Sequence, residues 1–265
     1  MSPLQFRLLA ALEGRNWWYV ATHRLIGCIL RSYASPPLSI LDVGCGTGGL
    51  LRHLAGVGTL WGVDPHPAAI DFARRRNRPE RAAHFLVMDA EGLEDGVRQP
   101  LDCITCIDVL YHEDVTDWRR TLGVFSRKLR AGGLLVLQVP AFECLRGAHD
   151  RAVKGARRFH RETLLAALKE NDFELLLCSH RFSWLFPGLL LKRTWERWMG
   201  ADNTSTNDFS ACSAMPRGWL RRCNAALLHL ALKENALILS GKSFAVGSSL
   251  FAVARKRGPD GSVPV

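Results

Sequence analysis

The sequence predicts an α/β fold built on one open sheet whose strands alternate with helices. Short apolar runs of strand length recur between residues 38 and 140, and segments with helical periodicity separate them. The first run, residues 40–43, leads into a glycine-dense turn at residues 44–49 and then into a helical pattern. Because glycine lets the backbone approach a ligand closely at a helix N-terminus, this turn indicates a nucleotide-type binding site.

The spacing of the glycines narrows this interpretation. Gly44, Gly46 and Gly48 are spaced G-x-G-x-G, and Asp42 precedes them at the end of the strand. A glycine-rich turn alone is a weak signal, because dinucleotide-binding folds carry G-x-G-x-x-G at the same junction. The spacing found here resembles motif I of the class I S-adenosylmethionine-dependent methyltransferases.

Two acidic residues follow at the ends of the next predicted strands. The strand at residues 60–64 ends in Asp64, where an acidic side chain reaches ribose hydroxyls. The strand at residues 84–90 carries Asp89 near its C-terminal end, where the family places the acid that accepts from the adenine amino group.

Two further segments continue the order of the family. The strand at residues 101–108 runs into residues 109–112, and in the family its end abuts the methionine moiety. Residues 129–140 resemble the family's turn into the fifth strand, with Ala131 in place of the usual proline. That replacement affects the stiffness of the turn more than the chemistry.

The resemblance implies a Rossmann-like seven-stranded methyltransferase sheet with helices on both faces. We expect an N-terminal helical lid at residues 1–37 and the cofactor-binding core at 38–181. A large helical cap is expected at 182–247, before the last strand and tail at 248–265.

The cofactor implied by the resemblance is S-adenosyl-L-methionine. Most residues expected to bind it lie at the carboxyl ends of the predicted strands, whereas Arg24 lies in the lid and is a candidate partner for the cofactor carboxylate. They are Asp42, Gly44, Cys45, Gly46, Gly48, Asp64, Pro65, Asp89, Ala90, Ile107 and Arg24.

The N-terminal region predicts helices at residues 3–13 and 18–33. Glu13 and the aromatic residues at their junction form the pattern E-x-x-x-W-W-Y, which resembles the lid of the quinone- and small-molecule-modifying branch of the family. The aromatic residues are therefore candidates for the wall of the acceptor pocket, and core packing is the alternative for the tryptophans. They are Trp17, Trp18 and Tyr19.

The acceptor site draws further candidates from the segments after strands four, five and six. Arg157 and Arg158 belong to a basic cluster that could hold a phosphate or carboxylate of the acceptor or could form a solvated face. A second cluster, residues 74–78, is expected to be a solvated face at a helix C-terminus. The remaining candidates are aromatic: Tyr111, Phe142, Phe182 and Trp184.

About 65 residues separate the last two predicted strands, at residues 173–180 and 249–255, where a short hairpin link is usual. Two amphipathic helices in this insertion would cover the carboxyl edge of the sheet, where ligands of open α/β folds bind. A cap of this kind would favour an apolar acceptor. Peripheral contact with a membrane is the alternative, since Trp, Leu, Lys and Arg are typical of interfacial helices.

For an acceptor that must lose a proton, the candidate bases are histidines beside the predicted methyl position. His149, paired with Asp150 just past strand five, is the preferred base. His112, just past strand four, is the second candidate and His160 a weaker third. A structural role is the alternative for each of them.

Composition limits the class of protein. The chain has 265 residues and a formal net charge of +10, and it lacks an apolar run long enough to span a bilayer or a secretory N-terminal pattern, so a cytoplasmic location is expected. Cys103 and Cys106 form C-x-x-C on a predicted strand, where they point to opposite faces, so neither a metal site nor a redox pair is expected. A monomer or a homodimer is expected.

These observations predict a methyltransferase that acts on an oxygen or carbon of a small, mostly apolar acceptor, such as a natural product, a quinone or a lipid-like molecule. The motifs used for nucleobase amines and pyrimidine carbons are missing after strand four, and the paired-glutamate loop of arginine methyltransferases and the acidic set of catechol enzymes are missing too, which leaves oxygen or carbon as the main acceptor atoms and nitrogen as a further one. A nucleic-acid methyltransferase is one alternative, motivated by the basic charge, but it would need a basic groove with exposed aromatics rather than an apolar cap. The other is an atypical member that binds the cofactor but catalyses a cyclisation or serves as a partner subunit.

Overall fold

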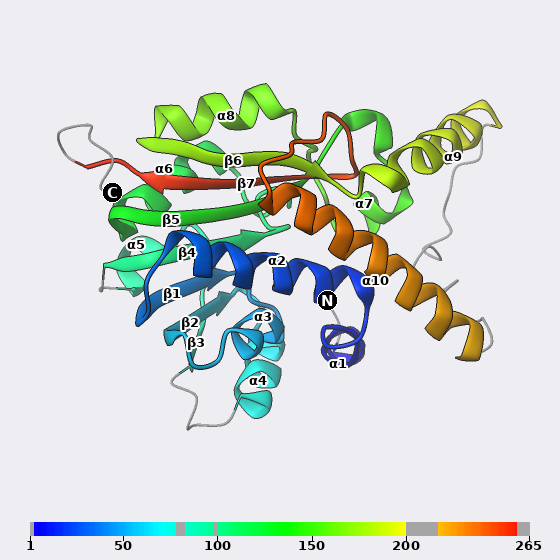
Figure 1. Ribbon diagram of the computed structural model, residues 1–265. Helices are drawn as coiled ribbons and strands as arrows, with labels where there is room; N and C mark the ends of the chain where they lie inside the picture. The colour runs from blue at the N-terminus through cyan, green and yellow to red at the C-terminus, as the bar shows by residue number, and fades with distance from the viewer. Residues whose placement is uncertain (1–2, 78–82, 98–99, 200–216, 259–265) are drawn as a thin grey trace.

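Seven strands form a single sheet in the order β3-β2-β1-β4-β5-β7-β6 (Figure 1). The computed structural model describes residues 3–77, 83–97, 100–199 and 217–258. All neighbouring strands are parallel except β7, which is antiparallel to both β5 and β6. The carboxyl ends of β1 to β6 therefore share one edge. The strands are β1 Leu38–Val43, β2 Gly58–Asp64, β3 Ala83–Val87, β4 Leu101–Ile107, β5 Leu129–Pro140, β6 Phe173–Arg181 and β7 Ser249–Lys256.

Helices cover both faces of this sheet, which confirms the predicted fold class. One face packs against α2 (Trp17–Tyr33), α3 (Gly49–His53) and α4 (Pro67–Arg76). The opposite face packs against α5 (Leu93–Gly96), α6 (Trp118–Lys128) and α8 (Arg161–Glu170). The first helix, α1 (Pro3–Leu12), packs on α4.

Side chains alternate between these two faces along each strand, as a pleated sheet requires. Cys103 packs in the core beneath α2, and Cys106 packs in the core beneath α6. The two thiols of the C-x-x-C pattern therefore lie on opposite faces, as the sequence predicts.

Two predicted strands end earlier than expected. The third strand ends at Val87, and Asp89 instead starts a turn in which its Oδ1 accepts from the Gly92 amide at 2.6 Å. The fourth strand ends at Ile107, because Asp108 adopts a left-handed backbone conformation with φ of 52°. Both acids thus lie just beyond the carboxyl edge.

The two helices expected between the last strands are present as α9 (Phe186–Trp198) and α10 (Arg217–Leu239). In Figure 1, α10 runs alongside the first half of α2, and the two helices are in contact. A small apolar cluster of Ala21, Phe182 and Ala231 joins them. Helix α9 contacts a short 3-10 helix, η2 (Glu143–Leu145), after β5. Among the described helices, none combines the length and the apolar character needed to cross a bilayer.

One acid lies within the sheet itself. Asp42 is 4% exposed in β1, and its Oδ1 accepts from the Thr105 hydroxyl of β4 at 2.7 Å. Burial raises the pKa of Asp42 to about 7, and the carboxylates of Glu13 and Asp64 add to that rise while the Thr105 hydrogen bond opposes it.

Asp42 should make the cofactor-free protein less stable as the pH rises from about 4 to about 7. In that window the unfolded chain has released the Asp42 proton and the folded chain still holds it, so the free energy of unfolding falls with rising pH. Asp42→Asn is neutral throughout and should remove this component, as measured by denaturant unfolding at several pH values. Asp71→Asn, on the exposed side of α4, is the control. Parallel pH profiles for wild type and Asp42→Asn would contradict the assignment.

Candidate functional site

The glycine loop lies at the carboxyl edge where the strand order reverses between β1 and β4, the position at which open α/β folds bind ligands. Gly44, Gly46 and Gly48 have φ values of 71°, 53° and 78°, in the left-handed region that glycine tolerates. A Cβ atom at Gly44 would lie 2.2 Å from Cγ2 of Val109. The loop therefore needs glycine for both conformation and space, and it presents its backbone to the edge.

Asp64 holds this loop from the end of β2. Its Oδ2 accepts from the Gly46 amide at 3.0 Å, and its Oδ1 accepts from the His66 amide at 2.9 Å and lies 3.0 Å from His66 Nδ1. A carboxylate has about four acceptor positions, so Asp64 can still take a donor from a ligand.

The lid is fastened to the same loop by a buried ion pair. Glu13 is 6% exposed, pairs with Arg76 of α4 and accepts from the Thr47 hydroxyl at 2.7 Å. Arg76 also donates to the Thr47 carbonyl at 3.2 Å. The prediction that residues 74–78 form a solvated face is therefore wrong for Arg76, because the lid covers its guanidinium.

The other predicted cofactor residues lie in three settings. Cys45 and Ala90 are buried and Ile107 is half-buried, at the ends of β1, β3 and β4. Pro65 and Asp89 are exposed at the same edge. Arg24 is exposed on α2, and after burial its charge is the next cause that lowers the pKa of His53. The structure thus places Asp64 in contact with the glycine loop and Asp42 in the strand that leads into it, while Arg24 lies on the exposed side of α2.

Asp108 is a candidate that the sequence analysis did not select. Its Oδ2 accepts from Gln138 Nε2 at 3.1 Å, while its buried Oδ1 has no hydrogen-bond partner among the described residues. Burial raises the pKa of Asp108 to about 6, and the Gln138 hydrogen bond and the guanidiniums of Arg181 and Arg158 oppose that rise. A buried carboxylate oxygen with no partner is costly, so it marks a position where a ligand could donate a hydrogen bond.

Two phenols lie within electrostatic reach of Asp108. Burial raises the pKa of Tyr19 and of Tyr111 well above the usual range, and the Asp108 carboxylate adds to both shifts. Both hydroxyls therefore stay protonated and can donate. Tyr19 comes from α2 and Tyr111 from the loop after β4, so the Asp108 carboxylate acts on phenols from two different segments.

The histidine candidates are not equivalent. The ring of His112 packs on that of Tyr111 with centroids 4.2 Å apart, and its Nδ1 lies 2.9 Å from the Val153 carbonyl. Burial lowers the pKa of His112, which favours a neutral ring with Nε2 as acceptor. His149 is exposed on α7 (Ala148–Ala152), and His160 is exposed at the N-cap of α8.

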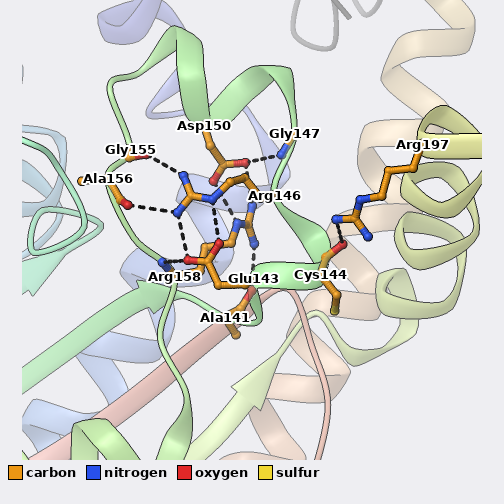
Figure 2. A network of polar contacts seen from close by, with 10 residues as sticks. All are labelled: Ala141, Glu143, Cys144, Arg146, Gly147, Asp150, Gly155, Ala156, Arg158 and Arg197. Atoms are coloured by element: carbon orange, nitrogen blue, oxygen red, sulfur yellow. Dashed lines mark hydrogen bonds and ion pairs between the residues drawn. The ribbon is translucent and has the colours of Figure 1, made fainter. Parts of the chain in front are cut away.

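The loop after β5 contains a network of ion pairs that occupies Asp150 (Figure 2). Arg158 donates to both Asp150 oxygens at 2.9 and 3.1 Å and to the Ala141 carbonyl at 2.8 Å. Asp150 also accepts from the Gly147 amide at 2.8 Å. Beside this pair, Arg146 donates to Glu143. The structure therefore shows the Asp150 carboxylate bound to Arg158.

Arg157 is likewise directed at protein atoms. Its guanidinium donates to the carbonyls of Leu110 and Val115 at 3.2 and 2.8 Å. The sequence predicts either a solvated face or an anion site for this basic cluster. Neither describes these two arginines, because carbonyl and carboxylate groups of the protein accept their hydrogen bonds. Arg157 joins the loops after β4 and β5, whereas Arg158 holds the loop after β5 together.

The aromatic candidates separate into two groups. The first is the packing between lid and insertion, where Trp17 meets Phe182 edge-on at 5.1 Å and Trp184 at 5.7 Å, and Trp18 meets Tyr19 at 4.8 Å. The second surrounds Phe142, which stacks on His180 with centroids 4.8 Å apart. A cavity of about 320 Å³ opens beside this pair, lined by Phe142, His160, Arg161, Glu162, His180, Ser243 and Ala245.

Comparison with known proteins agrees with this arrangement. Residues 40–133 match the family described as a methyltransferase domain. A dTDP-4-amino-2,3,4,6-tetradeoxy-D-glucose N,N-dimethyltransferase of Saccharopolyspora spinosa is 30% identical over 165 residues, which cover 61% of this chain and 63% of the relative. The matches span less than two thirds of the length of each curated relative.

Two solved structures share the fold over most of the chain. An S-adenosylmethionine-dependent methyltransferase from Clostridium acetobutylicum superposes with a TM-score of 0.58 at 13% identity, over 91% of this chain and 92% of that one. The cyclase SpnF superposes with a TM-score of 0.56 at 18% identity, over 91% and 82%.

The methyltransferase domain maps onto β1 to β4 and the start of β5, the same segment that carries the glycine loop and Asp64. The left-handed glycines and the remaining acceptor positions of Asp64 fit a nucleoside cofactor. The matched segment, residues 40–133, is therefore a class I S-adenosylmethionine-dependent methyltransferase domain, whose cofactor is S-adenosylmethionine.

Proposed function

We propose that the protein transfers the methyl group of S-adenosylmethionine to an oxygen or carbon of a small, mostly apolar molecule, such as a natural product, a quinone or a lipid-like compound. The observation that carries the proposal is the buried Oδ1 of Asp108, which has no hydrogen-bond partner among the described residues and lies at the edge next to the glycine loop, within electrostatic reach of Tyr19 and Tyr111. The aromatic contacts between Trp17, Phe182 and Trp184 support an apolar wall between lid and insertion.

The cofactor supplies a methyl group that is already electrophilic on a sulfonium, so the chain must align the acceptor and take up its proton. Asp108 Oδ1 accepts the acceptor proton, and the phenols of Tyr19 and Tyr111 donate to the acceptor and orient it. His112, with a neutral ring, is the alternative base. His149 ranks below both, because it is exposed on α7.

The cofactor site is proposed on Asp42, the glycine loop and the acids after β2 and β3. Asp64 takes the ribose hydroxyls and Asp89 the adenine amino group. Asp64→Ala should weaken S-adenosylmethionine binding by about 2 kcal/mol, roughly 30-fold, as expected for lost charge-assisted hydrogen bonds. Calorimetry on folded protein measures this. Asp71→Asn should leave the affinity unchanged, and an unchanged affinity in Asp64→Ala would remove Asp64 from the site.

Methyl transfer can be tested without knowing the acceptor. The protein is incubated with S-adenosylmethionine carrying a deuterated methyl group and a small-molecule extract, and mass spectrometry should show S-adenosylhomocysteine and one product carrying the labelled methyl. Asp108→Asn should slow this product by about 10²- to 10⁴-fold. The wild-type rate should rise as the pH passes about 6, because Asp108 must be ionised to accept a proton.

The outcomes of this assay separate the rival functions. A product without added mass would indicate a cyclisation, and no product at all would favour a partner subunit. A labelled amine would show that the acceptor atom is nitrogen rather than oxygen or carbon, as in the name of the Saccharopolyspora spinosa relative. In a parallel incubation with nucleic acid in place of the extract, labelled RNA or DNA would contradict the small-molecule proposal.

A peripheral lipid contact is proposed for α9. Leu191, Trp195 and Trp198 lie on one exposed helical face and are 72%, 61% and 75% exposed. Lys192 is an exposed basic residue on the same helix, and Arg221 and Arg222 are exposed on α10. Apolar aromatic side chains beside basic ones suit a surface of anionic lipids, and the net charge of +10 favours the same partner.

Vesicle sedimentation tests this contact. The protein should bind vesicles that contain phosphatidylserine more strongly than vesicles of phosphatidylcholine alone, and Trp195→Gln with Trp198→Gln should abolish that binding. Val246→Gln, an exposed apolar residue before β7, is the matched control. If the tryptophan variants instead turn a dimer into a monomer, the surface joins two copies of the chain and the lipid proposal is wrong.

A further inference from the structure

Arg181 is a fully buried arginine at the end of β6, and four elements of the fold meet on it. Its Nη1 donates to the Thr22 hydroxyl of α2 at 3.0 Å and to Gln138 Oε1 of β5. Its Nη2 donates to Asn235 Oδ1 of α10 at 3.2 Å. The guanidinium also lies 4.5 Å from the ring centroid of Phe182.

This cation has no carboxylate in direct contact among the described residues. Burial lowers the pKa of Arg181 to about 10, so the group remains charged at neutral pH, and Glu234 and Asp108 are the acids that oppose the shift. Glu234 accepts from the Phe182 and Ser183 amides at 2.6 and 2.8 Å and from the Ser183 hydroxyl at 2.7 Å. A buried charge requires a compensating charge. Because Glu234 already accepts hydrogen bonds from residues 182 and 183, Asp108 is the remaining acid, and one side chain connects it to Arg181.

That side chain is Gln138, which is fully buried. A guanidinium only donates hydrogen bonds and a carboxylate only accepts them, so Gln138 must turn Oε1 toward Arg181 and Nε2 toward Asp108. The amide thus has one possible orientation, and its dipole lies between the cation and the anion. Asp108 Oδ2 is fixed by this contact, which leaves Oδ1 as the oxygen without a partner.

We propose that Arg181 is a positioning residue that acts through Gln138 to keep Asp108 ionised and oriented, and that the lid and cap helices hold it in place. Thr22 anchors the guanidinium to α2 and Asn235 anchors it to α10. Asn235 in turn donates to the Ala21 carbonyl at 2.8 Å, so the two helices and the guanidinium form one unit. Seating of lid and cap is thereby coupled to the charge of Asp108.

Several charged and titratable groups act on Asp108, and an experiment must separate the effect of Arg181 from the effects of the others. Arg181 and Arg158 are the cations that act on it, from β6 and from the loop after β5. Tyr19 of α2 and Tyr111 of the loop after β4 lie within its electrostatic reach and stay neutral. Of the two cations, only Arg181 is linked to Asp108 by the Gln138 amide.

The experiment is a carbon-13 NMR titration of the aspartate side-chain carboxylates in the full chain, with Asp108→Asn to assign the signal. Arg181→Met should raise the pKa of Asp108 by about one unit, as expected on losing a nearby opposite charge. Gln138→Met should raise it too, although Arg181 remains. Arg161→Met, which removes a cation beside His180 that does not contact Gln138, should leave the pKa unchanged.

An unchanged Asp108 pKa in folded Arg181→Met would overturn the inference, as would an equal shift in Arg161→Met. If Arg181→Met does not fold, Gln138→Met decides by the same measurement, and no shift there is equally fatal. The role of Asp108 rests on the proposed function, but the titration needs no acceptor. A shifted pKa with no methylated product would therefore refute the function and leave the coupling standing.

Discussion

Charge buried at the carboxyl edge of the sheet must be compensated by partners from other elements, and this requirement holds the lid, loops and insertion in place. Glu13 reaches Arg76 and fastens the lid to the glycine loop. Asp150 takes Arg158 and shapes the loop after β5. Since a buried ion left alone costs several kcal/mol, each pair ties two segments that apolar packing would leave free to slide.

The sequence predicted the features whose signal is local. The glycine loop, Asp64 at the end of its strand and the two faces of C-x-x-C all follow from spacing within a few residues, and the structure places them as expected. The E-x-x-x-W-W-Y pattern contains Glu13, but the ion-pair partner of Glu13, Arg76, is 63 residues away. Spacing within one segment carries no information about such a pair.

The same limit explains the missed centre around Asp108. Gln138 lies 30 residues from Asp108, and Arg181 lies 43 residues from Gln138, so only the sheet brings them together. Strand β4 pairs directly with β5, and β6 is placed near β5 by the antiparallel β7 between them. The basic residues after β5 show a related limit. The composition gives the charges of Arg157 and Arg158, but it does not reveal that carbonyl and carboxylate groups of the protein accept their hydrogen bonds.

The contact between α10 and α2 links the insertion mechanically to the glycine loop. The second half of α2 is packed into the core through Leu25, Ile26 and Ile29, while its first turns carry Tyr19 and the contacts to α10. Any movement of α10 away from the edge must therefore pull on the start of α2, which continues into the segment that Glu13 pins to the glycine loop. A displacement of the insertion would therefore be transmitted through α2 to the glycine loop.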